Sequence, residues 1–534
     1  MRRLLAPSLI LAATLAAASA SAATPRDALV MAWNLDALIT LDPAQIGEVN
    51  GNDIMINVCN RLVQPNIKDV AKIEPQLAES WSSSEDGLTL TFKIRKDIKF
   101  PGGKPATAHD AAWSFKRAIH LNFGNAANLK EWGFTSEKAD QQIVATDDHT
   151  LRLNLDKPYP AGLLLSSLFS SNVASVLNRE TGEKNAKTVD GKSDYGNGWF
   201  KTNSDCVGPY KLRTWNANDV VILEANDVYF GQKPGLKRVI IRHVPESAAE
   251  RLALEKGDID VARLLNSDDL KGVASNAGIH IEQTLMHGFT YLAFNASDPI
   301  LSNPKVRHAI RYMIDYEALG KTIMAYRGAP RGSLVPIGAF GALDEKAGLP
   351  FKLDLDMAKK LLTEAGYPNG LQKKLILSAN TPNPDLAQHV QANAAKIGVK
   401  LDLEQMADAN LFTKMRAREF EIGLIGWGAG YPDAHSMFSR HALNPDNRLE
   451  SKLAMYPSWR SAWGDDKINE MVEKAMMEKD PAKRIAMYHE MQVFMMNNGP
   501  MAYMFQTIRP IAIRREVKDF AIGAFKVDYA SARK

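Results

Sequence analysis

The chain of 534 residues has few cysteines, little net charge and, beyond its first residues, no long apolar run. Its formal charge is only +4, because lysine and arginine nearly balance aspartate and glutamate. Such a balance lacks the basic excess that marks nucleic-acid-binding proteins. A membrane-spanning helix needs an apolar stretch of about eighteen residues, and none follows the N-terminus. We therefore expect a soluble mature protein with no nucleic-acid partner.

Sequence motifs of hydrolases and metalloenzymes are also missing. The eleven histidines form no HExxH motif, and neither a GxSxG elbow nor a penicillin-binding SxxK set with its partners occurs. His435 and His441 lie beside Asp433, but they are six residues apart, which does not place two metal ligands on one helix face. The sequence thus predicts a protein that is not an enzyme, with no catalytic residue, no metal and no cofactor.

The N-terminus carries the pattern of an export signal. Arg2 and Arg3 precede an apolar run from Leu4 to Ala18, and the small residues Ala20-Ser21-Ala22 follow. This predicts a signal peptide over residues 1–22, cleaved near Ala22. An exported protein can form disulfides, so the two cysteines, Cys59 and Cys206, are either bridged or remain as two buried thiols.

The rest of the chain, roughly 510 residues, is too long for one hydrophobic core, which favours two or three domains. Alternating apolar residues predict a half-buried strand over Leu88–Arg95. Thr107 to Asp110 has the spacing of a capping box at a helix start. Proline in the first helical turn predicts two further helices, from Asn303-Pro304 and from Asp480-Pro481.

Helical and strand patterns alternate between about residues 356 and 427. The expected elements are a helix over Met357–Ala365, a strand over Lys374–Ser378, a helix over Pro384–Ile397, a strand over Lys400–Met406, a short helix around 410–418 and a strand over Phe420–Trp427. This order predicts an α/β unit with a largely parallel sheet. Ligands gather beyond the carboxyl ends of such strands, which makes the loop Gly428–Asp433 a candidate ligand edge.

Several short segments together resemble the family of periplasmic solute-binding proteins that includes dipeptide-, oligopeptide- and nickel-chelate-binding members. Their order and spacing over nearly the whole mature chain carry the resemblance. They are Leu41-Asp42-Pro43, Leu77 to Trp81 with Asp86 to Thr89, Lys99-Phe100 through Ala108 and Asp110 to Ser114-Phe115-x-Arg117, Gly208-Pro209-Tyr210, Asn226-x-x-Tyr229, Gly257 to Asp260, Tyr291 to Asn295 and Val306-Arg307-x-Ala309.

The resemblance implies an α/β, two-lobed clamshell fold with an extra small subdomain in the N-terminal lobe. That lobe would span 23–282, with the small subdomain at about 62–190, and 500–534 would complete it, while 283–499 would form the C-terminal lobe. Such proteins are periplasmic substrate-binding components of ABC importers. The resemblance therefore implies a monomer that captures a small solute, with a peptide as the leading expectation, and delivers it to permease subunits in the inner membrane.

The family pattern points to a ligand loop after the last predicted strand. Trp427 would form an aromatic wall unless it packs in the core, and Tyr431 would add a ring and a hydroxyl unless it lies on the surface. In peptide-binding relatives an aspartate three residues after this tryptophan pairs with the ligand's amino terminus, but here the residue is Gly430. Asp433 could substitute, although it also matches a structural acidic position. The expected ligand residues of this loop are Trp427, Gly428, Ala429, Gly430, Tyr431 and Asp433.

The first lobe would supply the other side of the cleft. The stretch Glu48-Val49-Asn50 resembles the part of the family that lines the cleft, with Glu48 either pairing with a cationic group or solvated. Val207 is a further expected ligand residue, in a loop where Cys206-Val207-Gly208 replaces the family's glycine-threonine-glycine pattern. The absent aspartate at Gly430 leaves a second ligand class open, because a buried ammonium needs a carboxylate partner. That alternative is a nickel chelate, an opine, a sugar or a modified peptide.

Overall fold

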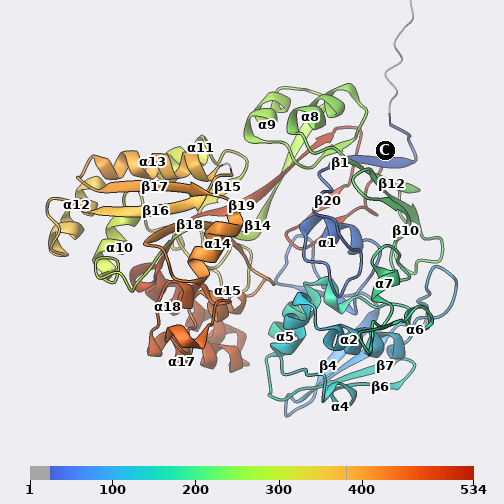
Figure 1. Ribbon diagram of the computed structural model, residues 1–534. Helices are drawn as coiled ribbons and strands as arrows, with labels where there is room; N and C mark the ends of the chain where they lie inside the picture. The colour runs from blue at the N-terminus through green and yellow to red at the C-terminus, as the bar shows by residue number, and fades with distance from the viewer. Residues whose placement is uncertain (1–23, 381) are drawn as a thin grey trace, which may run out of the picture.

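The computed structural model describes residues 24–380 and 382–534, which form two lobes (Figure 1). The predicted signal peptide over residues 1–22 lies outside the described residues. Two long strands pass from one lobe to the other, β14 (Ile279–Phe294) and β19 (Met501–Arg514). They belong to one eleven-stranded sheet with the order β10-β11-β12-β1-β13-β19-β14-β18-β16-β17, and β15 pairs with β19.

The first lobe is built on one end of this sheet. Its strand β1 (Ala28–Trp33) is buried throughout and runs parallel to both neighbours. A continuous apolar run is what a strand covered on both faces requires. The other strands of this half are β10 (Tyr210–Asn216), β11 (Val220–Ala225), β12 (Arg238–His243) and β13 (Val261–Ala262). The main helices are α1 (Val49–Met55), α6 (Arg179–Lys184), α7 (Asn197–Phe200), α8 (Ser247–Lys256) and α9 (Ser267–Ala274).

A small subdomain is attached to the first lobe and has a hydrophobic core of its own. Its antiparallel sheet has the order β4-β5-β7-β6. The strands are β4 (Ala78–Ser83), β5 (Thr89–Ile94), β6 (Ile143–Asp147) and β7 (Thr150–Asn154), and the longest helices are α2 (Ala108–Leu121) and α5 (Ala161–Phe169). The capping box predicted at Thr107 and Asp110 is confirmed at the start of α2. The predicted strand Leu88–Arg95 is confirmed as β5, which is one residue shorter at each end, and Leu88 before it is 37% exposed.

The second lobe confirms the predicted α/β alternation closely. It contains α12 (Leu355–Glu364), β16 (Gln372–Ser378), α13 (Asn383–Ala395), β17 (Lys400–Met406), α14 (Asp408–Arg416) and β18 (Ile422–Gly428). β16 is parallel to both β17 and β18, as the alternation predicted. The remaining helices include α10 (Pro304–Arg311), α11 (Tyr316–Lys321), α15 (His435–His441), α16 (Pro457–Arg460), α17 (Asp466–Met477) and α18 (Pro481–Asn498).

The crossing strands set the hinge between the lobes. Residues 279–285 of β14 pair with 508–514 of β19, and residues 289–293 pair with 501–506. The register shifts between these two stretches, where three residues of β14 oppose Thr507 alone. Such a bulge bends the ladder locally. The predicted lobe boundaries at 282/283 and 499/500 fall inside β14 and just before β19, and they stay predictions.

Two family segments far apart in sequence meet in the core of the first lobe. The Arg117 guanidinium on α2 donates to both carboxylate oxygens of Asp42, and both side chains are almost fully buried.

Cys59 and Cys206 form a disulfide with their α-carbons 4.8 Å apart, so the bridged alternative is the correct one. This disulfide joins the chain just after α1 to the loop before β10.

Candidate ligand-binding site

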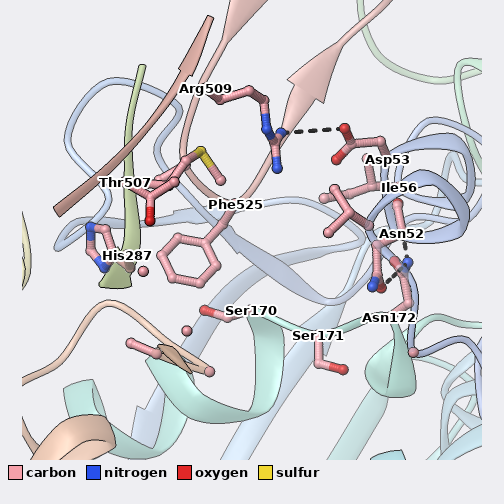
Figure 2. A pocket seen from close by; sticks show the side chains of 18 of the residues that line it. Asn52, Asp53, Ile56, Ser170, Ser171, Asn172, His287, Thr507, Arg509 and Phe525 are labelled. Carbon is pink, nitrogen blue, oxygen red and sulfur yellow. Dashed lines mark hydrogen bonds and ion pairs between the residues drawn. The ribbon is translucent and has the colours of Figure 1, made fainter. Parts of the chain in front are cut away.

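A cavity of about 630 Å³ lies between the two lobes beside the hinge strands. Its volume is within the range of about 300–1,000 Å³ that is typical of small-molecule sites. The first lobe, the hinge and the second lobe all contribute to its wall. Figure 2 labels residues of the first lobe and the hinge that line it. The lining residues used below are Trp33, Val49, Asn52, Asp53, Ile56, Arg61, Asn172, Arg263, Leu264, Arg327, His287, Gly428, Ala429, Gly430, Thr507, Arg509 and Phe525.

Helix α1 presents one face to the cavity. Val49, Asn52, Asp53 and the following Ile56 line it, and their spacing places them on one side of a helix. Asn172 Nδ2 donates to Asn52 Oδ1 over 3.0 Å, which fixes the amide beside the carboxylate (Figure 2). α1 therefore offers the ligand an apolar group, an amide and an acid within a few residues.

The bulge of the hinge forms another wall. His287 and Thr507 come from β14 and β19 at the register shift, and both line the cavity. Ala429 N–H donates to the His287 carbonyl oxygen over 2.6 Å, which ties the second-lobe loop to the hinge. The Phe525 ring stands edge-on to the His287 ring, with the ring centres 4.9 Å apart (Figure 2). Burial lowers the pKa of His287 to about 4, so this imidazole is neutral near pH 7.

Three charged side chains form a cluster at the end of α1. Asp53 Oδ2 lies 2.5 Å from Arg263 Nη2 and 3.3 Å from Arg509 Nη1. The Arg263 guanidinium also lies over the Trp33 ring, 4.1 Å from its centre. One carboxylate is thus paired with two guanidinium groups, and the cluster has a net positive charge.

Arg61 adds a second centre of positive charge. It is 1% exposed, and none of its three guanidinium nitrogens has a hydrogen-bond partner among the described residues. Burial lowers the pKa of Arg61 to about 10, which still leaves it charged near pH 7. A buried cation without a partner is costly, so this position calls for an explanation.

Four of the residues predicted from the sequence line this cavity. They are Val49 from α1 and Gly428, Ala429 and Gly430 from the end of β18. Gly428 has open space where a Cβ would stand, and the nearest atom to a Cβ on Gly430 is Ser436 Oγ. The three residues 428–430 thus bring backbone, and no side-chain acid, to the ligand space.

Trp427, Glu48 and Asn50 do not line the cavity. Trp427 precedes Gly428 in β18, and successive strand residues point to opposite faces. Its ring packs edge-on to His441 at 5.2 Å instead. Glu48 is the N-cap residue of α1 and accepts from its neighbour Gly47, while buried Asn50 donates to the Asn34 carbonyl oxygen.

Val207, Tyr431 and Asp433 also lie outside the cavity wall, and each has a packing role. Val207 is fully buried in the core of the small subdomain. Tyr431 extends from the second lobe into that same core. Asp433 is buried against Arg484, with both carboxylate oxygens within 2.7 Å of the guanidinium. Asp433 is therefore already neutralised and does not replace the aspartate absent at Gly430.

The sequence alone did not predict the charged residues of the cavity wall. Arg61, Arg263, Arg327 and Arg509 line the cavity from four separate segments, and a single sequence shows no reason to connect them. One signal was available: the spacing of Asn52, Asp53 and Ile56 after Val49 marks one helix face.

The described part of the chain contains no group of three His, Cys, Asp or Glu side chains placed to hold a metal ion. No helix within residues 24–380 and 382–534 is both long and apolar enough to cross a membrane.

Comparisons with known proteins agree with the resemblance noted from the sequence. The family model of bacterial extracellular solute-binding proteins, family 5 (middle region), matches residues 72–448. A probable D,D-dipeptide-binding periplasmic protein of Escherichia coli is 27% identical, over 94% of this chain and 93% of its own length. A heme-binding protein of Haemophilus influenzae is 26% identical, over 88% of this chain and 85% of its own. An ABC transporter substrate-binding protein of Listeria monocytogenes shares the fold with a TM-score of 0.79 at 21% identity, over 95% and 98% of the two chains. The chain belongs to the bacterial extracellular solute-binding proteins of family 5.

Proposed function

We propose that the protein is the periplasmic component of an ABC importer that captures a peptide and delivers it, as a monomer without catalysis, to permease subunits in the inner membrane. The observation that carries this proposal is the cavity at the hinge, which takes its lining from both lobes. A solute bound there contacts both lobes at once and favours the state in which they are together. The D,D-dipeptide-binding relative supports a peptide as the cargo.

A non-peptide solute is the second candidate. Gly430 brings no carboxylate to the place where peptide-binding relatives hold the ligand's amino group, and Asp433 is engaged by Arg484. The heme-binding relative supports a wider range of cargo.

A thermal-shift screen separates the two candidates. Di- to pentapeptides are compared with opines, sugar acids, nickel chelates and heme. A ligand that binds only the folded protein stabilises it by about 2.7 kcal/mol at a hundredfold excess over Kd, so the cargo class should raise the melting temperature by several degrees. A shift with a non-peptide class and none with peptides would favour the second candidate. Cleavage of any peptide during incubation would contradict a binding protein, and light scattering checks the monomer.

The contact of Tyr431 with the small subdomain makes a separate prediction. Its ring joins the two lobes without lining the cavity, and nearby Arg440 lies 3.8 Å from Glu131 across the same gap. We expect Tyr431→Ala to weaken ligand affinity by about tenfold, because burying an aromatic ring stabilises the state with the lobes together by about 1.5–3 kcal/mol.

Calorimetry of Tyr431→Ala with the solute found in the screen measures this loss, and small-angle scattering should show a more open ligand-free protein. Tyr367→Ala is the matched control, because its ring packs on the core within the second lobe. An unchanged affinity in Tyr431→Ala, or an equal loss in Tyr367→Ala, would refute a role for the contact in closure.

A further inference from the structure

The positive charge of the cavity is much larger than the ion pairs of its wall can neutralise. Among the described residues that line it, four are arginines and Asp53 is the one carboxylate, so the formal excess is three positive charges with His287 neutral. Arg327 is engaged with the Leu265 carbonyl oxygen. Arg61, Arg263 and Arg509 remain as the candidates for a ligand.

Arg61 provides the strongest evidence for an anion-binding site. Its burial is nearly complete and its guanidinium has no partner in the part of the chain that the structure describes. Burial lowers the pKa of Lys526, and the nearby charge of Arg61 lowers it further, while Asp528 opposes both effects. No hydrogen-bonding partner among the described residues balances the buried Arg61 charge, and a bound anion would supply its counter-charge.

Arg263 and Arg509 provide a second anion contact. Arg263 Nη2 pairs with Asp53, while its Nε and Nη1 are buried without a hydrogen-bond partner among the described residues, with the Tyr529 hydroxyl close enough to raise the pKa of Arg263. Within the part of the chain that the structure describes, the one hydrogen-bonding partner of the Arg509 guanidinium is the same oxygen of Asp53, at 3.3 Å. Planar guanidinium groups with free N–H donors match the two oxygens of a carboxylate or phosphate.

For a ligand amine, by contrast, the described residues of the cavity wall offer no carboxylate that is not already paired. Asp53 is shared by two arginines, Asp433 is paired with Arg484 outside this cavity, and residue 430 is glycine. A buried ammonium without a carboxylate would be costly. Apolar side chains beside the arginines, including Val49 at 55% and Leu264 at 39% exposure, offer a surface for an uncharged ligand body.

We infer that the captured solute is an organic anion, with a carboxylate or phosphate group bound by Arg61 and the Arg263–Asp53–Arg509 cluster, and that it needs no free amino group. This inference rests on the proposed function and narrows its cargo. It includes a peptide held by its carboxyl end and excludes a ligand that is recognised through its amine alone.

The first test compares probes that differ in one charged group. Ala-Ala, N-acetyl-Ala-Ala and Ala-Ala amide form one set, and glucose 6-phosphate with glucose forms another; the acids found in the broader screen are paired with their methyl esters. We expect the acids to raise the melting temperature, the N-acetyl acid to act as well as the free peptide, and the amide, the ester or glucose to have no effect. The set that responds tells carboxylate from phosphate. A neutral partner that stabilises as well as its acid would overturn the inference.

The second test needs no ligand. Arg61→Met removes a buried cation that lacks partners, so the ligand-free variant should melt at the same or a higher temperature. Arg331→Met is the matched control, because Arg331 is equally buried outside the cavity but donates to the carbonyl oxygens of Val335, Leu343 and Asp344. We expect this control to melt several degrees lower, because it strands buried acceptors. An equal loss in Arg61→Met would assign Arg61 to structure and overturn the inference.

Measuring the affinity of the Arg61 variants for the acid combines the two tests. Arg61→Met should bind the acid found above about ten- to a hundredfold more weakly, the loss of a charge-assisted hydrogen bond, and Arg61→Lys should keep part of the affinity and the preference for acids. Failure of every solute in the screen would count against solute capture, while the melting temperature of Arg61→Met still decides the role of this arginine.

Discussion

Removal of the Cys59–Cys206 disulfide should lower the free energy of unfolding by up to about 5 kcal/mol. The bridge closes a loop across a sequence separation of 147 residues, and in the chain-entropy account a loop of that size stabilises by about this amount. The closed loop contains the whole small subdomain, and the bridge anchors the end of α1, whose preceding residues line the cavity.

Urea unfolding of the Cys59→Ala, Cys206→Ala double variant measures this effect. Wild-type protein unfolded with and without a reductant is the control, and the reduced wild type should unfold near the midpoint of the double variant. The ligand affinity of the folded double variant should also fall, because α1 loses its anchor. Equal unfolding midpoints for the oxidised wild type and the double variant would show that the bridge contributes nothing to stability.

Breaking the buried pair of Asp433 and Arg484 should be nearly as costly. Both side chains are 4% exposed and share two hydrogen bonds, and Asp433 Oδ1 also accepts from His435 N–H. Asp433→Asn leaves the guanidinium buried without its counter-charge, for which we expect a loss of about 3–5 kcal/mol. Ligand affinity per folded molecule should stay unchanged, because this carboxylate does not line the cavity.

Two controls sharpen this second prediction. Replacing both partners, as Asp433→Leu with Arg484→Met, should cost less than Asp433→Asn alone, because no buried charge is then left unpaired. Glu317→Gln removes a pair with Lys321 that is largely exposed, and should change stability by less than about 1 kcal/mol. A selective loss of ligand affinity in Asp433→Asn, without loss of stability, would instead return Asp433 to the binding site.

The elements that could be predicted are those with local causes. The strand over Lys400–Met406 is β17 to the residue, since its start follows Gly398, whose φ of +80° ends the preceding helical segment. The capping box at Thr107 and Asp110 likewise depends on residues three apart. Such patterns need no knowledge of the rest of the chain.

The prediction of the binding site was correct for some residues of the loop after β18 and wrong for others. Gly428 to Gly430 could be placed because they lie at and just beyond the carboxyl end of β18, which meets the cavity. Trp427 was assigned to the same wall, but strand alternation turns its ring to the other face. Tyr431 could not be distinguished from a surface residue, because the core that buries it belongs to the other lobe.

The sequence by itself determined the family, the alternation of helices and strands in the second lobe and the absence of an acid at residue 430, because each is written in neighbouring residues or in an ordered series of motifs. Only the tertiary structure decided that the two cysteines form a disulfide, that Asp433 forms an ion pair with Arg484, and that the arginines at 61, 263 and 509 line one cavity. These three outcomes depend on distances between segments separated by up to hundreds of residues, and a charge acquires a partner, or lacks one, only when the folded chain brings such segments together.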